Sequence, residues 1–234
     1  MKKLFLIILF SFLLGQDDLL DVLNEGEDQF EYVESAFKST RVANAQSLEI
    51  PKPKILQFMI QHRFGSIENG FYDLFGTDYA VIRYDFSYGL NERIALGIGR
   101  SSFDKIYDIF LKAKLLRQSK GSRSMPISII LYSDIGIKTS RKSELTPALK
   151  DNFSNRLLYV NQLIIGRKFN QRFSFQIMPT MIHRNLVLTE NEEHQLASFG
   201  FAGRYKITSR FSVNGDYFVP IDKRESNFKN SFAI

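Results

Sequence analysis

The feature that most constrains this chain is an alternation of apolar and polar side chains that recurs along most of its length. It is clearest at residues 82–88, which read Ile-Arg-Tyr-Asp-Phe-Ser-Tyr. Successive side chains of a β-strand point to opposite faces, so this pattern predicts strands with one apolar and one polar face. Similar strands are expected near residues 56–63, 94–99, 109–115, 127–134, 173–180, 198–205 and 211–217. Residues 156–169 also suggest a strand, but Asn161 and Gln162 fall on opposite faces and leave its orientation open.

Three short connections share one pattern: Asn or Thr, a polar residue, Arg, and then a large apolar residue. It occurs at residues 91–94, 170–173 and 208–211. Asn and Thr favour turns because their side chains accept hydrogen bonds from nearby backbone N–H groups. Longer connections lie between them, at 65–79, 139–155, 185–194 and 220–229. With no stretch of helix length between strands, antiparallel hairpins are expected.

Periodicity alone fits both a water-soluble sandwich and a transmembrane barrel, in which the apolar face meets lipid. Strands of about ten residues, tight connections at one end and long ones at the other favour the barrel. Aromatic residues also gather near the predicted strand ends, as in interfacial girdles. They are Phe169, Phe173, Tyr205 and Phe211 beside the tight turns, and Phe64, Tyr79, Phe103 and Tyr107 at the other rim.

The predicted fold is therefore an all-β, antiparallel up-and-down transmembrane β-barrel of about 10–12 strands when complete. The alternating pattern gives about nine strands of the kind found in barrels. Residues 231–234 look like the beginning of another strand, which stops at the end of the sequence. We expect the C-terminal strands to be missing and the barrel to be open between its first and last strands.

The N-terminus has the pattern of an export signal. Two lysines precede the apolar run LFLIILFSFLL at 4–14, which is too short to span a bilayer, and polar residues follow Gly15. The expected division is a signal peptide at 1–15, an acidic leader at 16–50 and the barrel domain at 51–234. Residues 16–37 carry eight acidic and no basic side chains. This leader is either a small plug against a basic interior or a solvated flexible segment, and the second is favoured.

The absence of cysteine excludes disulfides, thiolate metal sites and thiol catalysis. The three histidines, His62, His183 and His194, fall near strand ends on one rim, and no nucleophile-elbow motif accompanies them. No enzymatic activity, cofactor or metal is expected. The basic residues are spread among the strands, so nucleic acid is not expected as a partner either.

Charged side chains on the polar faces are the candidates for lining the lumen: Arg63, Arg83, Asp85, Lys112, Lys114 and Asp134. Unpaired bases would form a positive constriction that selects anions. Bases paired with Asp85 and Asp134 would instead fill a small barrel, the favoured alternative. Arg100, Arg117 and Arg204 are expected at the membrane interfaces, where long basic side chains reach the headgroups.

Several short motifs occur in an order that resembles one family. They are FKSTRV (37–42), QHRFG (61–65), YDLFG (72–76), GIGRSS (97–102), KLLRQ (114–118), MPTM (178–181), HRNL (183–186) and GRYK (203–206). In these the chain is similar to an uncharacterised outer-membrane β-barrel family of Bacteroidetes, the domain of unknown function DUF5777. The resemblance spans roughly residue 16 to the C-terminus and implies a fold and a location, but no activity.

The expected function is that of an exported outer-membrane β-barrel, as a small-solute channel or ligand-binding barrel. One alternative is a structural or adhesion barrel with a filled lumen, which would present the loops at 65–79 and 139–155. Another is a soluble periplasmic all-β binding protein. The expected partners are outer-membrane lipid and a small anionic solute.

Overall fold

The computed structural model describes residues 30–140, 152–187, 193–221 and 231–233. Within these residues, ten strands form one antiparallel sheet in the order β12-β11-β10-β9-β8-β7-β5-β4-β3-β2. The strands are β2 (Leu56–Arg63), β3 (Val81–Gly89), β4 (Ile94–Ser101), β5 (Ile106–Leu116), β7 (Ser128–Lys138), β8 (Leu157–Lys168), β9 (Phe173–Arg184), β10 (Gln195–Lys206), β11 (Ser212–Pro220) and β12 (Ser231–Ala233). The predicted all-β, up-and-down arrangement is confirmed, including the late strand at residues 231–233.

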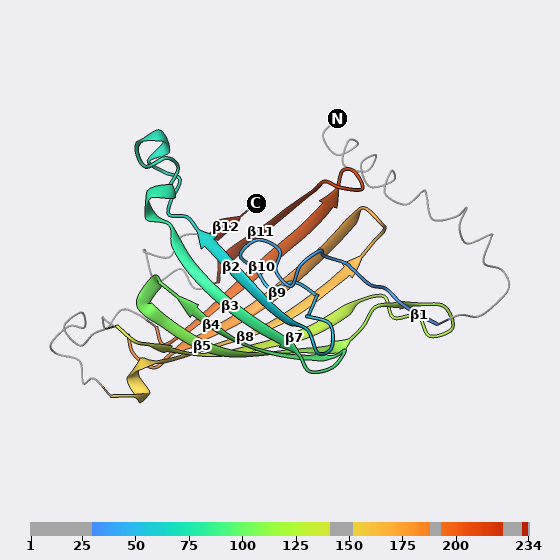
Figure 1. Cartoon of the computed structure of the whole chain (residues 1–234), viewed down its shortest axis with the longest axis horizontal. Coiled ribbons are helices and arrows are strands. Elements are labelled where there is room, and N and C mark those ends of the chain that lie inside the picture. The colour runs from blue at the N-terminus through green and yellow to red at the C-terminus, as the bar shows by residue number, and fades with distance from the viewer. Residues whose placement is uncertain (1–29, 141–151, 188–192, 222–230, 234) are drawn as a thin grey trace.

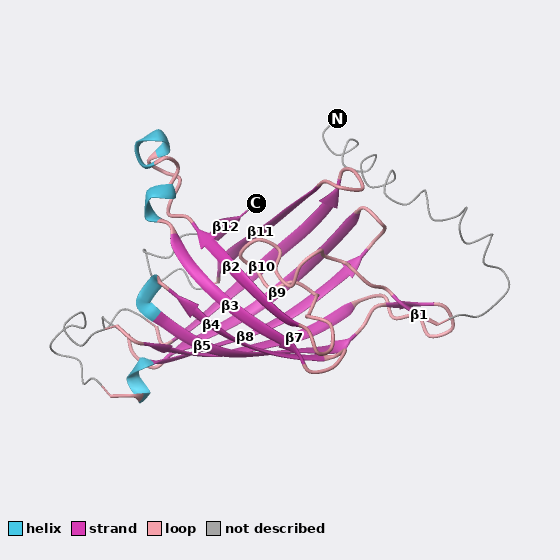
Figure 2. Cartoon of the chain, in the orientation of Figure 1, coloured by secondary structure: helices cyan, strands magenta, loops and turns pink. Residues whose placement is uncertain are grey.

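The sheet curls into a half-barrel, with β2 and β12 as its two edges (Figure 1). In the described part of the chain no ladder joins β2 to β12, as expected for an open barrel. That further strands follow stays a prediction. The helical elements in these residues are short 3-10 turns, η2 (Gly70–Asp73), η3 (Thr77–Tyr79), η4 (Phe103–Lys105) and η6 (Ser154–Arg156) (Figure 2). None of the described helices has the length and apolar character to cross a membrane.

The repeated turn pattern makes the same hydrogen bonds three times. The Oδ1 atom of Asn91 accepts from the backbone N–H groups of Arg93 and Ile94, and Asn170 does the same for the N–H groups of Arg172 and Phe173. At the third turn the Oγ1 atom of Thr208 accepts from residues 210 and 211. These turns lie at one end of the strands, called here the tight-turn end, together with the connection between β5 and β7 (Figure 1). The longer connection between β2 and β3 lies at the other end.

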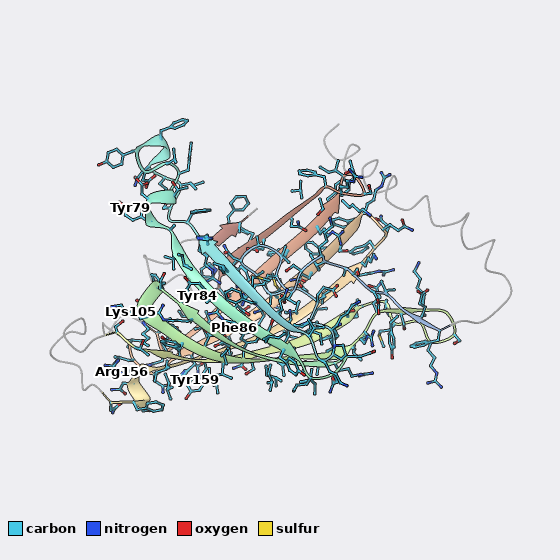
Figure 3. All side chains as sticks on the ribbon, viewed as in Figure 1. Tyr79, Tyr84, Phe86, Lys105, Arg156 and Tyr159 are labelled. Atoms are coloured by element: carbon cyan, nitrogen blue, oxygen red, sulfur yellow. The ribbon has the colours of Figure 1, made fainter. Side chains whose placement is uncertain are left out.

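The two faces of the sheet have opposite chemistry. On the convex face Phe58, Tyr84 and Phe201 are 51%, 41% and 38% exposed, whereas Lys112 on the concave face is 2% exposed. The side chains of Tyr84 and Phe86 can be followed on β3 in Figure 3. A water-soluble protein would show the reverse arrangement, so the apolar wall is the surface that meets lipid.

The strand whose orientation the sequence left open is now placed. On β8, Gln162 is buried on the concave face, and its Nε2 atom donates to Thr180 Oγ1 at 2.8 Å. Asn161 lies on the convex face, where its Oδ1 atom accepts from the Ser133 hydroxyl at 2.8 Å. β8 therefore places one amide on each face, and each amide makes one hydrogen bond to a neighbouring strand.

Exposed aromatic side chains occupy both ends of the convex wall. Phe169, Tyr205 and Phe211 lie at the tight-turn end, and Phe64, Tyr79, Phe103 and Tyr107 lie at the opposite end. Their positions match the two predicted girdles, in which ring edges meet the headgroup region and ring faces meet the acyl chains.

Candidate functional site

The concave side of the sheet, called here the hollow, is occupied by residues 36–49, the inner segment (Figure 1). The chain reaches it from the tight-turn end, where β1 (Glu31–Tyr32) pairs with β6 (Ser119–Lys120). It returns to that end at Lys54, whose N–H donates to the Gly89 carbonyl at 2.8 Å. The inner segment is itself a hairpin, with hydrogen bonds from Ser47 N to Thr40 O and from Val42 N to Ala45 O.

The leader was expected to be solvated and flexible, which is wrong for the inner segment, whereas Glu31, Glu34 and Ser35 before it are exposed. Ala36, Phe37, Ala45, Ser47 and Leu48 are all less than 9% exposed. Burial of their apolar surface in the hollow is favourable by about 25 cal/mol per Å². Residues 36–49 lie in the hollow as a plug would, but their ion pair with the sheet is made by a base, Arg41, and not by the acidic side chains on which the plug was predicted. Residues 1–29, with the predicted signal peptide and most of the acidic stretch, lie outside the described residues. The predicted boundary at residue 50 stays a prediction.

Strands β3 and β5 carry an ion-pair network under the inner segment. Both terminal nitrogens of Arg83 donate to the Asp108 carboxylate, one of them at 2.6 Å. Arg41 of the inner segment donates to Asp85 at 2.6 Å, and Arg83 also lies 3.6 Å from Asp85. These side chains are less than a tenth exposed. Buried charges of this kind require partners, so the inner segment supplies a cation that the sheet needs.

Lys112 fixes the two arms of the inner segment to β5. Its Nζ atom donates to the Thr40 carbonyl at 3.0 Å and to the Glu49 carbonyl at 2.6 Å. The side chain is 2% exposed. A buried ammonium depends on these carbonyl oxygens, so displacing the segment would remove its hydrogen-bond acceptors.

Asp216 on β11 holds the tip of the hairpin. Its Oδ2 atom accepts from the backbone N–H groups of Ala43, Asn44 and Ala45 at 3.2, 2.8 and 2.9 Å. Three adjacent N–H groups directed at one oxygen form a concave anion site of the kind that turns create. Gln176 adds a hydrogen bond from Nε2 to the Gln46 carbonyl at 2.6 Å.

One expected interfacial residue lies elsewhere. Arg204 is 9% exposed in the hollow, where its Nη1 atom donates to the carbonyls of Ser35 and Ala36 at 3.2 and 3.3 Å. The expectation failed because Arg204 shares the concave parity of Ala202, and the incoming chain offers carbonyl acceptors there. Arg100 does lie on the convex face, with its guanidinium 5.1 Å from the centre of the Tyr107 ring. Arg117 lies over the Tyr32 ring at 3.8 Å and donates to Glu92.

All six predicted lumen residues are on strand positions that face the hollow. Arg83, Asp85 and Lys112 join the network around the inner segment. Asp134 was expected to pair with a base, but it accepts from the Tyr132 hydroxyl at 2.6 Å instead. Arg63 and Lys114 are half-buried near opposite ends of the hollow. No ion pair involves either of them among the described residues.

Three residues that bind the predicted lumen residues or the inner segment were not predicted from the sequence: Arg41, Asp108 and Asp216. Asp108 had a detectable signal, because it lies four residues before Lys112 on β5 and so shares its face. Asp216 was placed on the polar face of its strand but not among the site residues. Arg41 had no such signal, since the inner segment has no regular period.

One small cavity lies between the inner segment and strands β3, β4 and β5. A cavity of about 10 Å³ is lined by Thr40, Arg41, Gln46, Pro51, Asp85, Ser87, Ala95, Phe110 and Lys112. That is about the volume that one water molecule requires. The cavity is therefore too small for a solute.

The histidines lie at the end opposite the tight turns, as predicted. The rings of His183 and His194 are 6.3 Å apart, and His194 Nδ1 is 2.8 Å from the Arg184 carbonyl. In the parts of the chain that the structure describes, no three His, Asp or Glu side chains are grouped so that they could hold a metal ion.

An apolar convex wall around a polar hollow that contains the inner segment defines a membrane β-barrel. The comparison with protein families gives the same class: a membrane-bound β-barrel domain of unknown function, DUF5777, matches residues 37–234. The chain belongs to this family, and the match includes the inner segment. No curated protein and no solved structure matches the chain. Membrane attachment excludes the alternative of a soluble binding protein.

Proposed function

We propose that this protein is an exported outer-membrane β-barrel whose interior is filled by its own inner segment, and that it serves as a structural platform for its long loops. The observation that carries the proposal is Lys112, a buried ammonium bound to carbonyls on both arms of that segment. An open pore would leave the concave charges in water, whereas here they fix a chain segment in place.

The outer membrane is part of the proposal. Its support is the export pattern at residues 1–15 and the up-and-down antiparallel sheet, which is the architecture of bacterial outer-membrane barrels. The proposed partners are the lipids around the convex wall. No enzymatic activity and no nucleic-acid partner are part of this proposal, because Asp85, Lys112 and Asp216 of the hollow are engaged in holding the inner segment.

Conductance in planar bilayers tests the filled interior. The full-length protein is compared with a variant in which residues 36–49 are replaced by a Gly-Ser linker of equal length. We expect the native protein to show almost no conductance and the linker variant to conduct. A linker of equal length in place of the loop at 64–79, outside the hollow, is the control and should not conduct. Equal, steady conductance of the native protein and the 36–49 variant would reject the proposal.

A second candidate, binding or passage of a small anion, is favoured by one observation. Arg63 on the edge strand β2 faces the hollow, and its Nε atom is buried without a hydrogen-bond partner. An uncompensated guanidinium of this kind attracts small anions. Anion over cation selectivity should fall in Arg63→Gln, measured in the conducting linker variant. Unchanged selectivity would remove this candidate.

Neutralising the other bases would test selectivity less cleanly. Arg83 is held by Asp108, and Lys112 holds the inner segment, so changing either disturbs folding. Lys114 is the better companion to Arg63, since it is half-buried and lies outside the ion pairs of the described residues. Lys114→Gln should lower anion selectivity without releasing the inner segment.

A further inference from the structure

Two glycines lie side by side on the convex face near the tight-turn end. Gly203 of β10 is opposite Gly215 of β11 in the ladder. Neither has a positive φ angle, so the backbone does not require glycine at either position. A Cβ added to Gly203 would be 3.8 Å from its nearest neighbours, which is an ordinary contact. Glycine weakens a strand interior and often marks a place where a ligand approaches the backbone.

Larger side chains surround this pair and make it a notch. Phe201 is opposite Tyr217 on one side, and Tyr205 is opposite Val213 on the other. All four are 38–49% exposed on the convex face. Phe175 of β9 is opposite Gly203 in the ladder between β9 and β10. The glycine notch is therefore a depression in the lipid-facing wall, edged by apolar and aromatic groups.

On the convex face, the line of paired residues from Gly215 through Gly203 and Phe175 ends at a cation, Arg167. Arg167 of β8 is opposite Phe175, and it is exposed on the convex face. Its guanidinium carbon is 5.4 Å from the centre of the Phe169 ring. No acidic side chain pairs with it in the described residues. The adjacent turns at 169–172 and 207–211 add the exposed Arg172 and Arg210 and carry no acidic residue.

A lone arginine on a lipid-facing wall costs about 2–4 kcal/mol at the membrane midplane and little near the interface. Its stem lies along apolar surface while its head reaches the headgroup layer. At that level the matching acceptor is a phosphate, to which a guanidinium donates two hydrogen bonds. Arg167 is separated from the glycine notch only by Phe175. Together the cation and the notch are complementary to an amphiphile with an anionic head.

We propose that the glycine notch and Arg167 form a binding site for one anionic phospholipid of the leaflet at the tight-turn end. An acyl chain lies over Gly203 and Gly215, and the phosphate pairs with Arg167, with Arg172 nearby. A second copy of the chain is the less suitable occupant. A symmetric contact between two such surfaces would bring their arginines together, and like charges at an interface repel.

The test is lipid retention by the full-length protein, measured by native mass spectrometry after release from detergent. The probes are palmitoyl-oleoyl phosphatidylglycerol and the corresponding phosphatidylcholine. Native protein should retain one phosphatidylglycerol in preference to phosphatidylcholine. Arg167→Gln should reduce that retention about tenfold, the equivalent of one charge-assisted hydrogen bond. Arg167→Lys should recover part of it, and Gly203→Leu, which fills the notch, should reduce it several-fold.

Two control variants separate the site from general effects. Arg93→Gln removes an exposed charge from the tight turn between β3 and β4, which lies at the same end of the strands but is distant from β8–β11 in the sheet order. Ala113→Leu enlarges a small convex residue on β5, distant from β10 in the sheet order. Both should retain phosphatidylglycerol as the native protein does. Equal retention of the two lipids, native-like retention by Arg167→Gln and Gly203→Leu together, or a dimer that these two variants abolish would overturn the proposal.

Discussion

The concave face has two walls that hold the same inner segment by different means. The charged wall, on β3 and β5, contacts it through Asp85 and Lys112, and Arg83 lies beside Asp85 on the same wall. The second wall, on β8–β10, is called here the neutral wall because it makes no ion pair with the segment among the described residues. It contributes Ile164, Met178 and Ala202, which belong to one buried cluster with Phe37 and Leu48. Its Arg204 donates only to the backbone carbonyls of Ser35 and Ala36. Ion pairs are directional, so the charged wall sets where the segment lies, while the neutral wall supplies burial that tolerates small shifts.

The largest effect is expected on the charged wall. Asp108→Ala leaves the Arg83 guanidinium buried with only a distant carboxylate, and it should lower the free energy of unfolding by about 3–5 kcal/mol. Urea titration in detergent micelles measures the change. The control is Asp104→Ala, which breaks the ion pair with Lys138, where both side chains are 39% exposed. That pair should contribute about 0–1 kcal/mol, and equal losses in both variants would show that burial does not matter here.

Releasing the tip of the inner-segment hairpin should cause an intermediate loss of stability. Asp216→Ala removes the acceptor of three backbone N–H groups, with an expected loss of about 1–3 kcal/mol. Since the chain has no cysteine, a single Asn44→Cys reports the tip through its rate of reaction with a maleimide. The rate should rise in the Asp216→Ala background and stay low in Glu92→Ala, which alters only the tight-turn end. A rate unaffected by Asp216→Ala would mean that the tip is held by other contacts.

The neutral wall should be more tolerant. Ile164→Val, at a side chain with no exposed surface, is expected to cost about 0.5–1.5 kcal/mol and to leave the maleimide rate at position 44 low. Met178→Leu keeps the volume and should cost less still. If Ile164→Val released the tip as Asp216→Ala does, the neutral wall would also set the position of the segment.

The smallest loss of stability is expected at a tight turn, outside both walls. Asn170→Ala removes the acceptor of two turn N–H groups that water can replace, so the loss of stability should be about 0.5 kcal/mol. Asn170→Asp keeps the acceptor and should unfold like the native protein. The same urea titrations serve for both variants, and a loss as large as that of Asp108→Ala would place the turn among the main determinants of stability.

The parts of the fold that depend on local pattern could be predicted from the sequence. Alternation on β3 fixed which way Tyr84 and Arg83 point, and the Asn-x-Arg turns required only side-chain bonds to N–H groups two and three residues away. For β8 the pattern was ambiguous, because an amide at Asn161 and another at Gln162 give no preference to either face. Pairing with β7 and β9 resolved it.

The site itself depended on contacts between distant residues. The partner of Arg83 proved to be Asp108, 25 residues away on the second strand along. The inner segment has neither a strand nor a helix period, and its burial follows from what the sheet offers: Asp85 for Arg41 and Asp216 for the tip. Local charge and hydropathy describe only the residues of the leader itself. They predicted a solvated leader because they contain no information about the partners that the sheet provides.

The central claim is that the apolar face of these strands meets lipid while the polar face encloses the inner segment. Nitroxide labels at single-cysteine positions of β5, in lipid vesicles, test it most directly through collisions with oxygen and with a water-soluble nickel chelate. Asp108 and Lys112 are left unchanged because they hold the ion-pair network and the inner segment. The account predicts high oxygen accessibility at 107, 109, 111 and 113, and low accessibility to both reagents at 110 and 114. High oxygen accessibility at the even positions, with nickel contact at the odd ones, would contradict it.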